Sequence, residues 1–141
     1  MKVEDIIFRG RKKDGEWAYG DLTRFQDGTI SIEDGIRYYE VDPNTVGQYT
    51  GLKDFYEAEI YDGDILESRA SENKEDWKRW KVLYEDGSFE FERIDEKPKR
   101  KKKRFIAERN LLCKDEIELY ELVIVGNIHD GLPNDERSET K

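Results

Sequence analysis

The residues best suited to chemistry are four carboxylates that lie within nine positions, Glu59, Asp62, Asp64 and Glu67. Hard cations such as Ca²⁺ take oxygen ligands of this kind, and paired carboxylates also serve general acid–base catalysis. The EF-hand pattern fails here because position 66 is Leu, and no further residues define a pocket. We therefore interpret the stretch as a turn in which Gly63 takes a positive φ and Asp64 begins a strand.

Other reactive residues are scarce. His129 is the only histidine and Cys113 the only cysteine, which excludes a histidine dyad, an internal disulfide and a multi-cysteine zinc site. The phosphate-loop pattern and the Gly-x-Ser-x-Gly elbow are both absent from the sequence. We interpret His129 as a structural or surface residue and Cys113 as a small buried side chain. The sequence therefore predicts no catalytic residue, metal site or cofactor, and a protein that is not an enzyme.

A basic segment is the sharpest candidate for binding. Residues 97–104 carry seven positive charges, whereas the whole chain carries −9, so the remaining residues together carry −16. Such a run contacts several phosphates in a salt-sensitive way, and a neighbouring aromatic such as Phe105 would stack on bases. It would equally dock on an acidic neighbouring subunit or stay solvated between strands. The candidate contact residues are Lys97, Lys99, Arg100, Lys101, Lys102, Lys103 and Arg104.

Aromatic residues supply a second candidate contact. They make up 12% of the chain, and residues 49–61 hold more of them than a short strand unit needs. Core packing accounts for most of the chain's aromatic residues, because a tyrosine ring can be buried while its hydroxyl stays in water. Tyrosine is also enriched where subunits meet. Tyr49, Phe55 and Tyr56 are therefore candidate interface residues.

The elements that carry these residues are predicted to be strands. Apolar residues recur with a period of two over residues 6–10, 17–22, 29–32 and 36–41. Asp-Gly pairs at 14–15, 27–28 and 34–35 separate these runs, and Asp-Gly supplies the positive φ that two-residue hairpins need. Pro43 has no N–H to donate and ends the pairing. We expect a β-meander subdomain over residues 3–44.

The second half repeats the pattern. Residues 64–67, 80–84 and 88–92 are typical strands, and Asp86-Gly87 joins the last two into a hairpin. The stretch 105–122 admits either strands or a helix, and we predict strands there. Charged residues at 71–79 fit one helical turn or a loop. We expect a small, bent, SH3-like sheet or barrel over 47–130, with charged insertions at 68–79 and 95–104 and a flexible tail at 131–141.

Composition sets the class of protein. The chain has 141 residues, of which 42% are charged and 35% hydrophobic, so its core is thin. No apolar run approaches the roughly 20 residues that cross a bilayer. The acidic N-terminal residues do not fit a signal peptide. We expect a cytoplasmic protein that binds neither a membrane nor a small-molecule substrate.

Four blocks of the sequence, in this order and spacing, resemble the YopX family of bacteriophage and prophage proteins. They are Trp17-x-Tyr19-Gly20-Asp21-Leu22, the stretch 41–54 that ends Gly-Gln-Tyr-Thr-Gly-Leu-Lys-Asp, Glu59-Ile60-Tyr61-x-Gly63-Asp64-Ile65, and Val125-Gly126-Asn127-Ile128-His129-Asp130. The resemblance covers roughly residues 3–130, and the stretch 41–54 is its most specific part. It implies an all-β protein of two small subdomains, a phage or prophage origin, and no catalytic residues to assign.

One departure from that family bears on the aromatic stretch. Where such proteins carry an Asn-Gly-type turn after Lys53-Asp54, this chain has Phe55-Tyr56-Glu57-Ala58. We expect an aromatic loop in place of a tight hairpin, with an added apolar contact surface.

The sequence thus predicts an all-β protein with an N-terminal meander and an SH3-like bent sheet or barrel. Its function is predicted to be that of a non-catalytic phage accessory module that self-assembles, as a homo-oligomer, or binds a protein in the bacterial host cytoplasm. The alternative is a nucleic-acid-binding module that uses residues 97–104. An enzyme is a distant third alternative.

Overall fold

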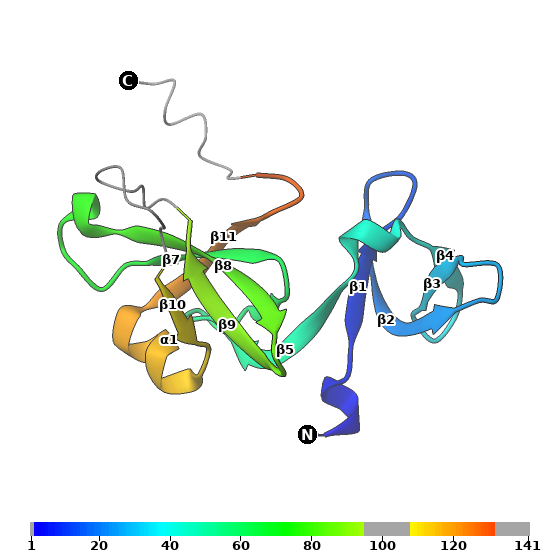
Figure 1. Ribbon diagram of the computed structural model, residues 1–141, viewed down its shortest axis with the longest axis horizontal. Coiled ribbons are helices and arrows are strands. Elements are labelled where there is room, and N and C mark those ends of the chain that lie inside the picture. The colour runs from blue at the N-terminus through cyan, green and yellow to red at the C-terminus, as the bar shows by residue number, and fades with distance from the viewer. Residues whose placement is uncertain (1, 95–107, 132–141) are drawn as a thin grey trace. The chain divides into compact units, whose positions relative to one another are not determined.

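The computed structural model describes residues 2–94 and 108–131, and it divides the chain into two compact units, Met1–Gly51 and Leu52–Lys141. Each unit is built on antiparallel strands (Figure 1). The boundary falls inside one strand, β5 (Gly47–Lys53), which begins in the first unit and ends in the second. None of the helices in the described ranges is long and apolar enough to cross a membrane.

The first unit is a meander whose last strand returns to pair with its first. The strands β1 (Phe8–Arg11), β2 (Trp17–Arg24), β3 (Ile30–Glu33) and β4 (Tyr38–Glu40) pair in chain order. β5 then pairs with β1, and short 3-10 turns, η1 (Val3–Asp5) and η2 (Pro43–Thr45), precede β1 and β5. Ala18, Ile32 and Val41 are buried together at its centre.

Glycines with a positive φ form the turns of the first unit, although the turns do not always have the predicted length. In the β1–β2 and β2–β3 hairpins three residues form the loop, and only the third, Gly15 or Gly28, has a positive φ (88° and 92°). The hairpin predicted at Asp14-Gly15 is thus confirmed, but its loop has three residues and not two, because Asp14 stays outside the left-handed region. The aspartates instead accept backbone N–H groups from within the turns.

The second unit holds a five-stranded antiparallel sheet in the order β10-β9-β8-β7-β11. Its strands are β7 (Asp64–Ser68), β8 (Lys78–Glu85), β9 (Ser88–Arg93), β10 (Arg109–Leu111) and β11 (Leu122–Asn127). A short strand, β6 (Glu59–Tyr61), pairs with β5, and η3 (Lys74–Asp76) precedes β8. The all-β class is confirmed, but the described strands form an open sheet with edges at β10 and β11 and not a closed barrel.

The core of the second unit is carried by the β8–β9 hairpin. Asp86 and Gly87 both have a positive φ (55° and 86°), which is the type I′ geometry predicted for an Asp-Gly pair. This register places Val82 opposite Phe91, and the rings of Trp80 and Phe91 meet edge to face at 4.9 Å. The buried cluster consists of Ile60, Leu66, Trp80, Val82, Phe91, Leu112, Ile117 and Leu122.

The strand predicted across 105–122 is wrong over most of its described part. After β10 the chain forms α1 (Lys114–Tyr120) and buries only Ile117 from that helix. Glu121 then takes a left-handed conformation (φ 51°), which ends the helix and directs the chain into β11. Seven residues with one buried position give too little periodicity to reveal a helix in the sequence.

Two charged insertions had been expected in the second unit. At the first, expected at 68–79, β7 reaches Ser68 and β8 starts at Lys78, so that η3 and its flanking residues connect the two paired strands. The second joins β9 to β10, which are antiparallel neighbours. Its residues 95–104, including the basic run 97–104, and the tail from 132 lie outside the described residues.

Candidate functional site

The β5–β6 turn presents aromatic side chains from a fixed backbone. Within it, the Asp54 N–H donates to the Ala58 carbonyl (2.7 Å) and the Glu57 N–H to the Asp54 carbonyl (2.9 Å). Glu57 is left-handed (φ 73°), in the place that glycine occupies in the β1–β2 and β2–β3 turns. The expectation of a loop in place of a tight hairpin is therefore wrong, since the same three-residue turn forms without glycine.

Asp54 fixes this turn with its carboxylate, which is buried. Its Oδ1 accepts the backbone N–H groups of Tyr56 (2.8 Å) and Ala58 (2.9 Å). Its Oδ2 accepts the N–H of Ile124 in β11 (2.9 Å). One side chain thus ties both sides of the turn to a strand 70 residues away in the sequence. Charge-assisted bonds of this kind are strong, so the turn is held rigidly.

The three predicted interface residues divide between interior and surface. Tyr49 is buried, whereas Phe55 is 40% and Tyr56 67% exposed. The rings of Phe55 and Tyr56 meet edge to face with centroids 5.6 Å apart. Only these two of the three side chains are therefore available for contact with another molecule.

Carboxylates outnumber the exposed cation of the hairpin, Lys53, around this aromatic pair. The N–H of Phe55 donates to the carbonyl of Leu122 (2.8 Å), so the turn lies beside the first residue of β11. The half-exposed Tyr120 and Glu121 immediately precede that residue, and Glu57 and Glu59 are exposed on the hairpin itself. We name this set the aromatic–acidic surface; it consists of Phe55, Tyr56, Glu57, Glu59, Tyr120 and Glu121.

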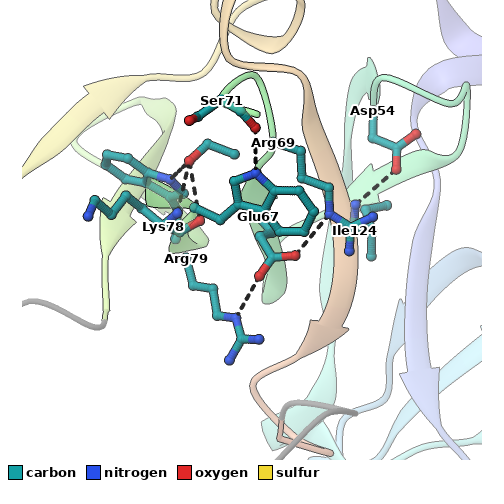
Figure 2. A network of polar contacts seen from close by, with 10 residues as sticks. Asp54, Glu67, Arg69, Ser71, Lys78, Arg79 and Ile124 are labelled. Carbon is teal, nitrogen blue, oxygen red and sulfur yellow. Dashed lines mark hydrogen bonds and ion pairs between the residues drawn. The ribbon is translucent and has the colours of Figure 1, made fainter. Parts of the chain in front are cut away.

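A buried ion-pair network lies on the neighbouring strands. The Glu67 carboxylate accepts from Arg69 Nε (2.9 Å) and Arg79 Nε (3.1 Å), as Figure 2 shows. The pairing of β7 with β8 sets Glu67 opposite Arg79. The Arg69 guanidinium also lies over the Trp77 ring, 5.0 Å from its centroid. Sequence reasoning missed this network. In the sequence Glu67 is one charged residue among many, and Arg79 is identified as its partner only when the pairing of β7 with β8 is known.

The four-carboxylate cluster does not form a metal site among the described residues. Glu67 is engaged by arginines, and Asp64 accepts the N–H of Tyr61 (2.7 Å) from within the turn. Gly63 has φ 97°, so the predicted turn at 62–64 is confirmed. His129 is exposed, and its N–H donates to Asn127 Oδ1 (2.9 Å), while Cys113 is half-buried at the start of α1.

The first unit contributes a cationic region of its own. The guanidinium groups of Arg9 and Arg11 both lie over the Trp17 ring, at 4.4 and 4.3 Å from its centroid. An open groove of about 460 Å³ at the end of β1 is lined by Arg11, Lys12 and Lys13 together with Glu40 and Asp42. Because the two carboxylates offset two of the three positive charges, the groove has only a weak preference for an anion.

The fold and the site define a class of protein. It is an all-β protein of two units. Among the described residues, buried carboxylates accept hydrogen bonds from backbone N–H groups or from arginines, and a rigid turn carries exposed aromatic rings. The chain belongs to the YopX family: the family model described as YopX protein matches residues 7–132. No match emerges from a comparison with curated proteins.

Proposed function

We propose that this protein is a non-catalytic binding module that uses its β5–β6 turn to contact a protein, with a second copy of the same chain as the first candidate. The exposed Phe55–Tyr56 pair on a turn fixed by Asp54 is the observation that carries this proposal. Aromatic side chains dominate the binding energy of protein interfaces. A rigid presentation also lowers the entropy lost on binding.

Sedimentation velocity at micromolar concentrations tests this function. We expect the wild type to self-associate and the double variant Phe55→Ser/Tyr56→Ser to be shifted towards monomer. Ile36→Ser is the matched control, because Ile36 is 86% exposed on a turn of the first unit and its loss should change nothing. A wild type that stays monomeric, or a double variant that associates like the wild type, would remove the self-assembly proposal.

Nucleic-acid binding is the second candidate. The observation that favours it is the basic run, with seven cations in residues 97–104. If the run binds phosphates, the logarithm of the affinity should fall linearly with that of the salt concentration, with a slope near 0.9 per phosphate neutralised on duplex DNA. Replacing Arg100, Lys101, Lys102 and Lys103 with Ser should abolish such binding. No retardation of DNA or RNA at low salt would rule this candidate out.

The resemblance to phage and prophage proteins supports a proposal about the setting of the protein. We infer a phage or prophage origin and action in the cytoplasm of a bacterial host. Lysis fractionation of cells that express the tagged protein would check the location, and recovery in the membrane fraction would contradict it.

A further inference from the structure

The aromatic–acidic surface has the chemistry that recognises cations. Phe55, Tyr56 and Tyr120 supply ring faces, which attract Lys and Arg side chains. Glu57, Glu59 and Glu121 supply carboxylates, which accept charge-assisted hydrogen bonds from the same groups. The Glu59 carboxylate also accepts from the Tyr61 hydroxyl through Oε1 (3.5 Å), which leaves its second oxygen for such a bond. Arg69 bonds through its backbone N–H to the carbonyls of Tyr120 and Glu121, but its guanidinium is held by Glu67. A Lys- and Arg-rich segment therefore fits this surface.

The chain itself contains such a segment. Residues 97–104 carry seven positive charges, whereas the rest of the chain carries −16. We propose that the aromatic–acidic surface binds this basic run from a second copy of the chain. The inference rests on the proposed function, because it uses the same turn and names its partner.

The position of the run in the strand order favours a second copy over the run of the same copy. The run leaves from β9 and returns to β10, whereas the turn bonds to β11 at the opposite edge of the sheet. A run that docked on its own copy would make no contact between chains, so that removing it would leave the association state unchanged and would overturn the inference.

The contact is heterologous, since a segment of one copy meets a different surface of the other. Two such contacts around a twofold axis close a dimer, and other arrangements give larger rings or open chains. Charge pairing sets the orientation and the rate of association, and the aromatic rings add affinity. We therefore expect self-association to weaken as salt increases.

A complementation experiment tests the proposal. One variant lacks the surface (Phe55→Ser/Tyr56→Ser), and another lacks the run (Arg100→Ser/Lys101→Ser/Lys102→Ser/Lys103→Ser). Each alone should be shifted towards monomer in sedimentation velocity. Their mixture should recover association, because one chain supplies the run and the other the surface. Glu16→Lys, an exposed charge change on a turn of the first unit, is the control for Glu57→Lys, which should weaken association while the aromatic rings are kept.

A peptide with the sequence of residues 96–105 gives a direct measure of binding. It should bind the variant without the run, and adding Phe55→Ser/Tyr56→Ser should weaken its affinity at least about tenfold. Equal affinity for both chains would overturn the proposal, because charge alone would then hold the peptide.

The outcomes separate this inference from the proposed function. If the aromatic variant loses association while the run variant keeps it, the inference fails and the proposed function stands. If neither variant changes the association of the wild type, both fail. If the run variant keeps its size but loses binding to DNA, the run serves nucleic acid and the inference is overturned.

Discussion

The two units of the molecule use the same strand pattern but are stabilised in different ways. The first buries a cluster of three apolar side chains and stacks two arginines on Trp17. The second buries a cluster of eight apolar side chains and an ion-pair network around Glu67. Because stabilisation increases with the apolar surface buried, we expect the second unit to be the more stable. Turn geometry contributes a larger share of the stability of the first.

Phe91→Ala in the second unit has the largest expected effect. Phe91 is completely buried against Trp80, and removing its ring should lower the free energy of unfolding by about 3–5 kcal/mol. Hydrogen exchange read by mass spectrometry should show faster opening in the second unit and little change in the first. Equal acceleration in both would mean that the chain opens as one cooperative body and would break the comparison.

Glu67→Gln tests whether the second unit also depends on its buried charges. The substitution leaves Arg79, with a side chain only 9% exposed, without its carboxylate, and should cost about 3 kcal/mol. Glu108→Gln is the control, because Glu108 is half-exposed in its pair with Arg93 (3.3 Å) and surface pairs contribute about 1 kcal/mol at most. Denaturation by urea measures both, and similar losses would contradict a special role for Glu67.

Gly20→Ala tests the dependence of the first unit on backbone geometry. Gly20 has φ 152°, and an added Cβ would lie 2.0 Å from the Glu33 carbonyl oxygen, so the chain has to shift. We expect a loss of about 2 kcal/mol in the first unit. Gly28→Ala adds a Cβ in open space at φ 92° and should cost about 1 kcal/mol. If the two variants have the same melting midpoint, the close approach of Gly20 to the Glu33 carbonyl does not add to the cost of the substitution.

Glu57→Gly gives the β5–β6 turn a left-handed glycine like those in the turns of the first unit. Glycine adopts the left-handed conformation of Glu57 (φ 73°) without a steric penalty, so the variant should gain about 1 kcal/mol. Glu57→Ala keeps the Cβ and should gain nothing. A thermal midpoint that does not rise for the glycine variant would show that other contacts of Glu57 offset the strain.

The smallest expected effect is on pH dependence in the first unit. Hydrogen bonds from the N–H groups of Arg37 and Ile36 lower the pKa of Asp34 below its ordinary value of 3.8. A lowered pKa contributes stability that is present above the unfolded value and is lost as pH falls through the folded value. Asp34→Asn keeps the acceptor and removes the titration, so its melting midpoint should fall slightly less than that of the wild type on going from pH 5 to pH 2.

Local rules predicted the strands and several turns well. Alternating apolar residues predicted β2, β3, β7, β8 and β9, and the Asp86-Gly87 turn follows from backbone preference alone. The rules failed where a residue takes an unfavoured conformation. Glu57 and Glu121 are both left-handed without being glycine or asparagine. The sequence therefore did not predict the tight turn at Glu57 or the end of α1 at Glu121.

The candidate site was predictable only in part. Sequence composition named Phe55 and Tyr56 as candidate contact residues, and both are exposed, but it did not separate them from Tyr49, which is buried by the packing of the strand. The role of Asp54 depends on Ile124, 70 residues away. Long-range partners of this kind follow from strand order, which no local pattern specifies.

The position of the unit boundary inside β5 has a practical consequence for dissecting this protein by limited proteolysis. Proteases cut exposed and flexible segments, and domain boundaries usually offer such a linker. Here the chain crosses the boundary as a strand that pairs with β1 at one end and with β6 at the other. Trypsin should therefore leave Lys53 intact while both pairings persist, so that cleavage at this boundary does not separate the two units.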